Sequence, residues 1–281
     1  MADWELFVDG VDFGEGPRWR DDRLWYSDFH QATVYAVDVD GTREAVFSGL
    51  PDRPSGLGWM PDGTLLVVSM TRRKLLRADG DQLVEHADLG ELATWHCNDM
   101  VVDRHGNAYV GNFGFDLEGG ADPRGAELIL VRADGTAEIV AEDVKFPNGS
   151  VITPDESTLI VGESFGGGYE AWTIQPDATL TDRRRWAETP GMAPDGCTLD
   201  DAGGIWFSDA VGSQVVRVLE GGQITHQVPT PQPTFACMLG GADGRTLYAL
   251  TAPGSHPDDV AGKGGGAIYQ RRVEHAHAGR P

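Results

Sequence analysis

The chain repeats one short pattern six times, and this repeat limits its possible folds more than any other feature. The cleanest copy spans residues 54–80 and contains a short strand, a Pro-Asp-Gly turn, a buried strand, a loop and a third strand that ends at Asp-Gly. Similar copies begin at Glu15, Cys97, Pro147, Pro194 and Phe235. Short β-rich runs between Asp-Gly and Asn-Gly pairs are typical of hairpins, so the sequence predicts an almost all-β protein.

The length of the repeat identifies the architecture. Aligning the step that opens each unit places six residues in one column: Glu15, Ser55, Asn98, Asn148, Asp195 and Ala236. The units recur about every 40 to 50 residues, which is the length of a propeller blade. A propeller closes on itself, whereas a solenoid needs atypical end repeats. We therefore predict one six-bladed β-propeller domain over residues 1–281, with a polar C-terminal tail at about 274–281.

The two ends of the chain bear on ring closure. Units one to five each offer a fourth strand, but the sixth offers only three. The segment WELFVD precedes the first unit and contains strand-forming residues. Pairing of this segment as the missing outer strand would join the first and last blades and remove an exposed edge. We expect this N-terminal closure, and we expect the tail with His275 and His277 to be disordered or a weak adventitious metal site.

The aligned column predicts a metal site. First strands line the channel of a propeller, so column residues from distant units converge on its axis. Four of them carry a side-chain oxygen: Glu15, Asn98, Asn148 and Asp195. Taken singly, each is equally well interpreted as a turn or capping residue. Together, uncompensated carboxylates on a narrow axis would repel and lose hydration, and one divalent cation resolves that conflict. Such oxygens favour Ca²⁺, with Zn²⁺, Mn²⁺, Mg²⁺ or Fe²⁺ as alternatives.

Composition limits the possible binding partners and the cellular compartment of the protein. Lys and Arg number 22 against 44 Asp and Glu, a formal net charge of -22 that would repel phosphate backbones and anionic lipid. We expect no nucleic acid and no membrane partner, although an acidic surface is often only a solubility device. Three cysteines without CxxC spacing indicate neither a disulfide framework nor a zinc-thiolate site. With no signal-like start, a cytoplasmic monomer or weak homo-oligomer is expected.

Four motifs carry a family resemblance: GEGPRW at Glu15, CNDMVVDRHGNAYVGN at Asn98, FPNG at Asn148 and APDG at Asp195. With them, essentially the whole chain resembles the family of gluconolactonase, senescence marker protein and luciferin-regenerating enzyme. The resemblance implies a divalent ion held by Glu15, Asn148 and Asp195, with Asn98 contacting substrate or completing the metal shell. The set also resembles the calcium site of diisopropyl fluorophosphatase, a related propeller that hydrolyses phosphorus–fluorine bonds.

The chain departs from the family pattern in its third unit. Sugar-lactone hydrolases of the senescence marker type have an arginine two residues before the matching asparagine, where this chain has His96. A bidentate donor for hydroxyls or a carboxylate is therefore missing at this position. The acidic residue linked to substrate in the family falls on Asp116, inside the insertion GFDLEGGADPRGAE. We take His96, Asn98 and Asp116 as candidate substrate-binding residues and Trp95 as a candidate pocket wall.

The predicted chemistry is hydrolysis of a small lactone. A channel metal with an open coordination position can polarise a carbonyl and lower the pKa of bound water. Asp195 is the candidate general base or water-orienting carboxylate. An esterase or phosphotriesterase-like hydrolase on the same metal, and a non-catalytic calcium-binding propeller, are the alternatives. A Ser-His-Asp hydrolase is disfavoured because an all-β repeat lacks the strand-to-helix turn of that site. Further channel candidates are Asp28, Asn112, Glu163 and Asp209.

Overall fold

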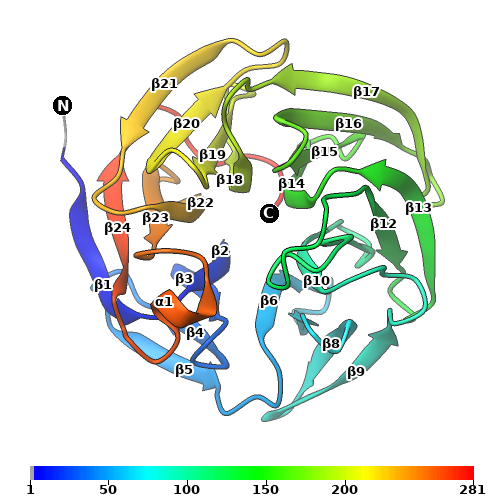
Figure 1. Ribbon diagram of the computed structural model, residues 1–281, viewed down its shortest axis with the longest axis horizontal. Coiled ribbons are helices and arrows are strands. Elements are labelled where there is room, and N and C mark those ends of the chain that lie inside the picture. Colours follow the sequence, from blue (N-terminus) through cyan, green and yellow to red (C-terminus); the bar gives the residue numbers. More distant parts are fainter. Residues whose placement is uncertain (1–2) are drawn as a thin grey trace.

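Six four-stranded antiparallel sheets surround a central axis, as the computed structural model of residues 3–281 shows (Figure 1). The predicted six-bladed β-propeller is confirmed. Within residues 3–281 the only helix is the short α1 (Pro257–Val260), in the connection between the second and third strands of blade 6. No helix in this range has the length and hydrophobicity that crossing a membrane requires.

The first three blades each run from an inner to an outer strand. Blade 1 contains β2 (Gly14–Arg20), β3 (Arg23–Asp28), β4 (Thr33–Val37) and β5 (Arg43–Phe47). Blade 2 contains β6 (Pro54–Trp59), β7 (Leu65–Ser69), β8 (Lys74–Asp79) and β9 (Gln82–Asp88). Blade 3 contains β10 (Cys97–Val102), β11 (Ala108–Asn112), β12 (Ala126–Val131) and β13 (Ala137–Val144).

The remaining blades repeat this order until the ring closes. Blade 4 contains β14 (Pro147–Ile152), β15 (Thr158–Glu163), β16 (Gly168–Ile174) and β17 (Leu180–Glu188). Blade 5 contains β18 (Pro194–Leu199), β19 (Ile205–Asp209), β20 (Gln214–Val218) and β21 (Ile224–Pro229). Blade 6 contains β22 (Thr234–Gly240), β23 (Thr246–Thr251), β24 (Gly266–Arg272) and β1 (Glu5–Val11).

Strand β1 closes the ring. It pairs antiparallel with β24, so that Glu5 lies opposite Gln270 and Val11 opposite Gly266. Val11 is fully buried in a cluster that joins blades 1 and 6. Because the chain passes from β1 directly into blade 1, the first and last blades are linked covalently as well as by packing, and the predicted N-terminal closure is confirmed.

The inner strands of neighbouring blades pack backbone against backbone. A Cβ atom built on Gly149 would lie 2.4 Å from the carbonyl oxygen of Asp195 and 2.6 Å from the amide nitrogen of Cys197. A Cβ on Gly16 would lie 2.9 Å from the carbonyl oxygen of Ser55. Glycine therefore follows the column residue in these two blades because no side chain fits there. The interpretation of the Asn148-Gly149 step as a turn is wrong, since it lies within a strand.

The C-terminal tail crosses one end of the channel, and its expected disorder is wrong. Arg280 exchanges two backbone hydrogen bonds with Ile152, of 2.8 and 3.0 Å. The amide of Ala278 donates to the carbonyl of Leu199 at 2.9 Å. Both partners are the last residue of an inner strand, whereas the candidate ligands are the second residues of theirs. The tail therefore covers the end of the channel opposite the candidate site.

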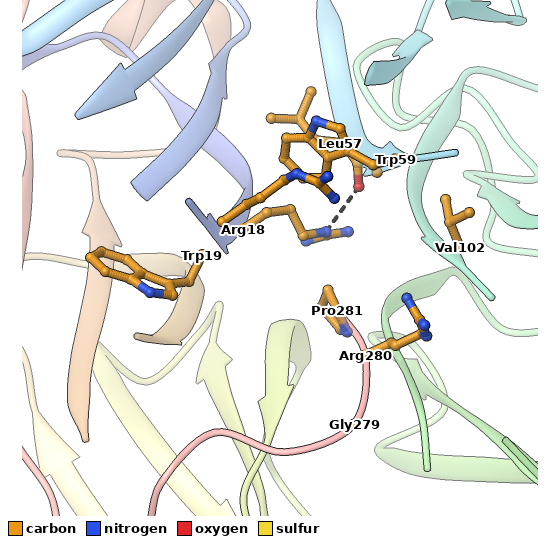
Figure 2. Close-up of a pocket in the computed structure, with 10 residues that line it drawn as sticks. Arg18, Trp19, Leu57, Trp59, Val102, Gly279, Arg280 and Pro281 are labelled. Carbon is orange, nitrogen blue, oxygen red and sulfur yellow. Dashed lines mark hydrogen bonds between the residues drawn. The ribbon is translucent and has the colours of Figure 1, made fainter. Parts of the chain in front are cut away.

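Both tail histidines are also engaged by protein atoms. His275 Nδ1 lies 3.4 Å from a carboxylate oxygen of Asp201, and His277 Nε2 bonds the carbonyl oxygen of Pro281. Pro281 faces a cavity of about 150 Å³ whose opposite wall includes Trp59 (Figure 2). The histidines thus help to hold the tail rather than forming a pair of free metal ligands.

Replacing Gly149 with alanine should destabilise the propeller, because the new methyl group must separate two inner strands. We expect a loss of about 1–3 kcal/mol in the free energy of unfolding, the usual cost of overpacking a core, measured by urea denaturation. Gly90→Ala is the matched control, since its methyl group would meet only flexible side-chain atoms, an Asp88 carboxylate oxygen at 3.1 Å and Arg73 Nη2 at 3.9 Å. Equal stabilities of the two variants would contradict this close strand packing.

Candidate metal site and channel mouth

Four candidate ligands start four different inner strands. Glu15 lies on β2, Asn98 on β10, Asn148 on β14 and Asp195 on β18, each at the second residue of its strand. All four are buried, with exposed fractions of only 6–8%. The column predicted from the repeat is therefore a structural ring, made of equivalent positions in different blades.

An irregularity in every inner strand falls at this ring. The pairing register shifts between Glu15 and Arg18 in β2, between Pro147 and Ser150 in β14, and between Pro194 and Cys197 in β18. The same interruption occurs in β6, β10 and β22. A bulge of this kind redirects side chains and is common beside functional sites. Simple strand alternation therefore does not decide which of these side chains faces the axis.

The two column carboxylates have strongly raised pKa values. Burial raises the pKa of Glu15 well above its usual range, and the nearby charges of Asp195 and Asp99 raise it further, although the Gly16 amide and the charge of Arg18 oppose this. Burial also raises the pKa of Asp195 to about 8, although hydrogen bonds from the Gly196 amide and the Asn148 side chain oppose this. Both effects follow from removing carboxylates from water and placing like charges together.

A buried ion pair accompanies the column. Arg18 Nη2 lies 2.7 Å from Asp99 Oδ1, and the two side chains are 5% and 7% exposed. Arg18 also donates through Nε to the carbonyl of Leu57 at 2.9 Å (Figure 2) and through Nη2 to the carbonyl of Met100. Arg18 and Asp99 largely neutralise each other. Within residues 3–281, no ion pair joins Glu15 or Asp195 to a basic side chain.

Sequence reasoning missed this ion pair, although one signal was available. Four of the six column residues are followed by glycine, at Gly16, Gly56, Gly149 and Gly196. In the third unit Asp99 takes that position instead, and a Cβ on Gly56 would lie 2.8 Å from its carboxylate oxygen. A charged residue where four of the other five blades have glycine indicates a specific buried partner, which is Arg18.

The donor set fits a hard divalent cation. Glu15 and Asp195 supply two carboxylates without a basic partner, and Asn98 and Asn148 supply carboxamide oxygens, which are ligands that Ca²⁺ and related ions accept. In the part of the chain that the structure describes, no three His, Cys, Asp or Glu side chains form a group able to hold a metal ion. A metal at this axis therefore needs the carboxamide oxygens as well as the carboxylates.

The second-strand candidates hold loops in place. Each accepts a hydrogen bond from a backbone amide in the loop that leads into the inner strand of its own blade. Asp28 accepts from the amide of Asp12 at 2.9 Å, and Asn112 accepts from that of Trp95 at 3.4 Å. Glu163 accepts from the amide of Lys145 at 2.8 Å, and Asp209 accepts from that of Ala193 at 3.0 Å. These side chains position the loops at the mouth of the channel.

Two of the predicted substrate-binding residues, His96 and Asp116, lie in loops of blade 3, whereas Asn98 lies on β10. His96 stacks on Trp95 with ring centroids 5.1 Å apart, and its Nδ1 is buried with no hydrogen-bond partner among the described residues. Asp116 Oδ1 accepts the amide of Gly119 at 2.7 Å, so this carboxylate partly folds onto its own loop. Trp95 packs against an apolar cluster at the mouth, formed by Phe13, Phe29, Met70, Phe113, Phe115, Phe146, Phe235, Ala252 and Val260.

A serine nucleophile is not built at this site. The run Gly162–Gly166 reads GESFG and matches the spacing of a nucleophile elbow. However, Ser164 connects two strands, and its hydroxyl donates to the carbonyl of Pro194 at 2.7 Å. The same hydroxyl accepts from Asn148 Nδ2 at 3.2 Å. Ser164 therefore orients a column residue.

These features define a class of protein, a closed six-bladed propeller with a buried carboxylate and carboxamide column under an aromatic mouth. The chain belongs to the family described as SMP-30/Gluconolactonase/LRE-like region, which it matches over residues 13–253. The resemblance seen in the four sequence motifs is confirmed.

Several similar curated proteins are lactonases by name. Pentonolactonase XacC of Haloferax volcanii is 31% identical over 294 residues, covering 95% of this chain and 92% of that protein. The 6-deoxy-6-sulfogluconolactonase of Pseudomonas putida is 29% identical over 250 residues, covering 85% and 83%. The solved structure of the calcium-binding protein regucalcin from Agrobacterium tumefaciens shares the fold, with a TM-score of 0.81 at 18% identity, covering 99% of this chain and 96% of that one.

The metal-free protein should lose stability as the pH rises. Because the folded-state pKa of Asp195 is raised from 3.8 to about 8, the folded chain binds a proton that the unfolded chain has released over this range. We expect the melting temperature in chelator to fall between about pH 5 and pH 8, and to fall several degrees less for Asp195→Asn. The exposed Asp81→Asn serves as control. Parallel pH profiles for all three proteins would contradict the raised pKa.

Proposed function

We propose that this chain is a metal-dependent hydrolase that opens a small lactone, with one divalent ion held by Glu15, Asn98, Asn148 and Asp195. The observation that carries the proposal is the pair of buried carboxylates without a basic partner, beside two carboxamides on the same axis. Four oxygen donors without histidine or cysteine favour Ca²⁺. The names of the curated relatives support a gluconolactonase-like activity, with a lactone as the substrate.

The bound metal would polarise the lactone carbonyl and lower the pKa of a coordinated water. Asp195 is the proposed catalytic residue, which orients the attacking water and accepts its proton. The Asn148 side chain lies close enough to Asp195 to lower its pKa, and Asn148 Nδ2 donates to the Ser164 hydroxyl at 3.2 Å. We propose that Asn148 orients the Asp195 carboxylate, as a general base requires.

Substrate would enter from the aromatic end, because the tail covers the other end of the channel. We propose that His96, Asn98 and Asp116 contact the lactone and that Trp95 forms a wall of the pocket. Phe165, 48% exposed, packs on Phe146 with ring centroids 5.2 Å apart and extends the apolar surface at this end. We further propose a cytoplasmic monomer or weak homo-oligomer. The three cysteines are buried and free, as suits a reducing compartment.

A lactone panel assayed by pH-stat tests the proposal directly. We expect chelated enzyme to be inactive and to regain turnover with Ca²⁺, or with Zn²⁺, Mn²⁺, Mg²⁺ or Fe²⁺. At saturating metal, Asp195→Asn should lower kcat by about 100-fold or more, because a general base typically contributes that much. Glu15→Gln should raise the metal concentration needed for activity, and the exposed Asp81→Asn should match wild type.

Three outcomes would contradict the proposal in different ways. Turnover that is unchanged by chelator would contradict a role of the metal in the reaction. A chelator that lowers only the melting temperature, with no lactone hydrolysed, would favour a non-catalytic calcium-binding propeller. Faster hydrolysis of simple esters or phosphotriesters than of any lactone would favour the esterase or phosphotriesterase-like alternative.

A further inference from the structure

One backbone hydrogen bond recurs in all six blades and defines a second ring just outside the column. In each blade the amide of the residue after the second strand donates to a carbonyl two or three positions before the column residue, at 2.9–3.2 Å. The residues whose carbonyls accept these bonds form the mouth ring: Phe13, Arg53, His96, Phe146, Ala193 and Pro233. The equivalent bond shows that these six positions are structurally the same in each blade.

The mouth ring is chemically one-sided. Phe13 and Phe146 belong to the buried apolar cluster, and Ala193 and Pro233 carry no polar side-chain group. Its polar members, Arg53 and His96, lie on the adjacent blades 2 and 3. A ligand at the mouth therefore meets apolar side chains around most of the ring and hydrogen-bonding side chains along one arc.

The backbone joins the two polar positions directly. The amide of Met70 donates to the carbonyl of Arg53 at 3.0 Å, and the carbonyl of Met70 accepts from the amide of Cys97 at 3.1 Å. Cys97 immediately follows His96 in the chain. Met70 therefore bridges the two blades at the depth of the mouth ring and holds Arg53 next to the blade 3 loop.

Arg53 meets the insertion of the third unit. Its guanidinium Nη1 forms an ion pair with Glu118, in the long connection between β11 and β12. The two side chains are 26% and 37% exposed, so they face solvent at the mouth rather than the core. A guanidinium carries five N–H donors, and a carboxylate accepts more than one hydrogen bond. The pair therefore keeps donors and acceptors for a third partner.

The loop does not need this ion pair for its shape. Asp116 Oδ1 accepts the amide of Gly119, and Arg124 Nε donates to the carbonyl of Gly114 at 2.6 Å. Partly exposed ion pairs contribute little to stability, typically about 0–1 kcal/mol. Fold stability alone therefore gives a weak reason for placing Arg53 and Glu118 together at the mouth.

We propose that Arg53 and Glu118 form a specificity-determining pair that recognises the hydroxyl groups of a polyhydroxylated lactone. This inference rests on the proposed lactonase function and names its substrate class. The planar guanidinium fork donates to two neighbouring hydroxyl oxygens, and the Glu118 carboxylate accepts from a hydroxyl. The apolar arc of the mouth ring contacts the C–H face of the sugar ring. Because the pair is neutral overall, it selects hydroxyls rather than a charged group.

Comparison of two substrates tests the pair. Steady-state kinetics would be measured with a polyhydroxylated aldonolactone and with δ-valerolactone, which has no hydroxyl group. We expect Arg53→Gln to lower kcat/KM for the aldonolactone by about 10- to 100-fold, mainly through KM, because hydrogen bonds from a charged donor are lost. For δ-valerolactone, kcat/KM should stay at the wild-type value.

Further variants make the test specific. Glu118→Gln should show the same selective loss, to a smaller extent, and Arg53→Lys should not restore binding because lysine lacks the planar fork. The matched control is Arg72→Gln, which removes an exposed arginine from the neighbouring loop of blade 2. The ratio of the two substrates within each preparation is independent of how much protein is correctly folded.

The outcomes separate this inference from the function on which it rests. If the wild-type protein hydrolyses neither substrate, both the lactonase proposal and the hydroxyl-recognition pair are contradicted. Wild type that hydrolyses lactones, combined with an Arg53→Gln variant that loses both substrates equally or neither, overturns the hydroxyl-recognition pair and leaves the lactonase proposal standing.

Discussion

Adjacent inner strands approach each other until the backbone of one occupies the space of a side chain on the next. At Gly149 this distance leaves no room even for a methyl group. The residues before these glycines occupy equivalent positions, at the level where the strand pairing is irregular. Two of them are carboxylates, and burial together with nearby negative charge raises their pKa values. In the proposed function, one divalent cation balances these two charges.

The charges along the axis divide into two layers with different roles. Arg18 and Asp99 balance each other and bond to backbone carbonyls, which makes them a permanent part of the core. Glu15 and Asp195 have no such partner in the described chain, so their balance is left to a ligand. Beyond the ion pair, the C-terminal tail covers the channel, and the aromatic end is left as the route to the site.

The fold and the column were predictable because both are repeated features. Six copies at blade-like spacing indicated the ring, and a lone strand at the N-terminus indicated its closure, since a missing outer strand must be supplied from somewhere. The four candidate ligands followed from alignment of equivalent positions. Glycines after the column residues are also typical of turns, because close packing of strands and a turn favour the same residue type.

Features that occur only once in the chain could not be predicted from the sequence. The Arg18–Asp99 pair joins positions far apart in the chain and occurs once. The tail is polar and short, and it is ordered by backbone hydrogen bonds that its composition does not reveal. Arg53 and Glu118 come from loops of different blades, and neither loop has a sequence pattern that predicts the contact between them. Such contacts depend on the three-dimensional register of the ring rather than on local periodicity.

Anomalous diffraction from a crystal soaked in Mn²⁺ tests the central claim most directly, because it locates a metal without relying on activity. A single dominant anomalous peak among the side-chain oxygens of Glu15, Asn98, Asn148 and Asp195 is the expected result, at metal–oxygen distances of about 2.0–2.6 Å. A fully soaked crystal with no peak on the channel axis, or with its main peak elsewhere, would contradict the metal site.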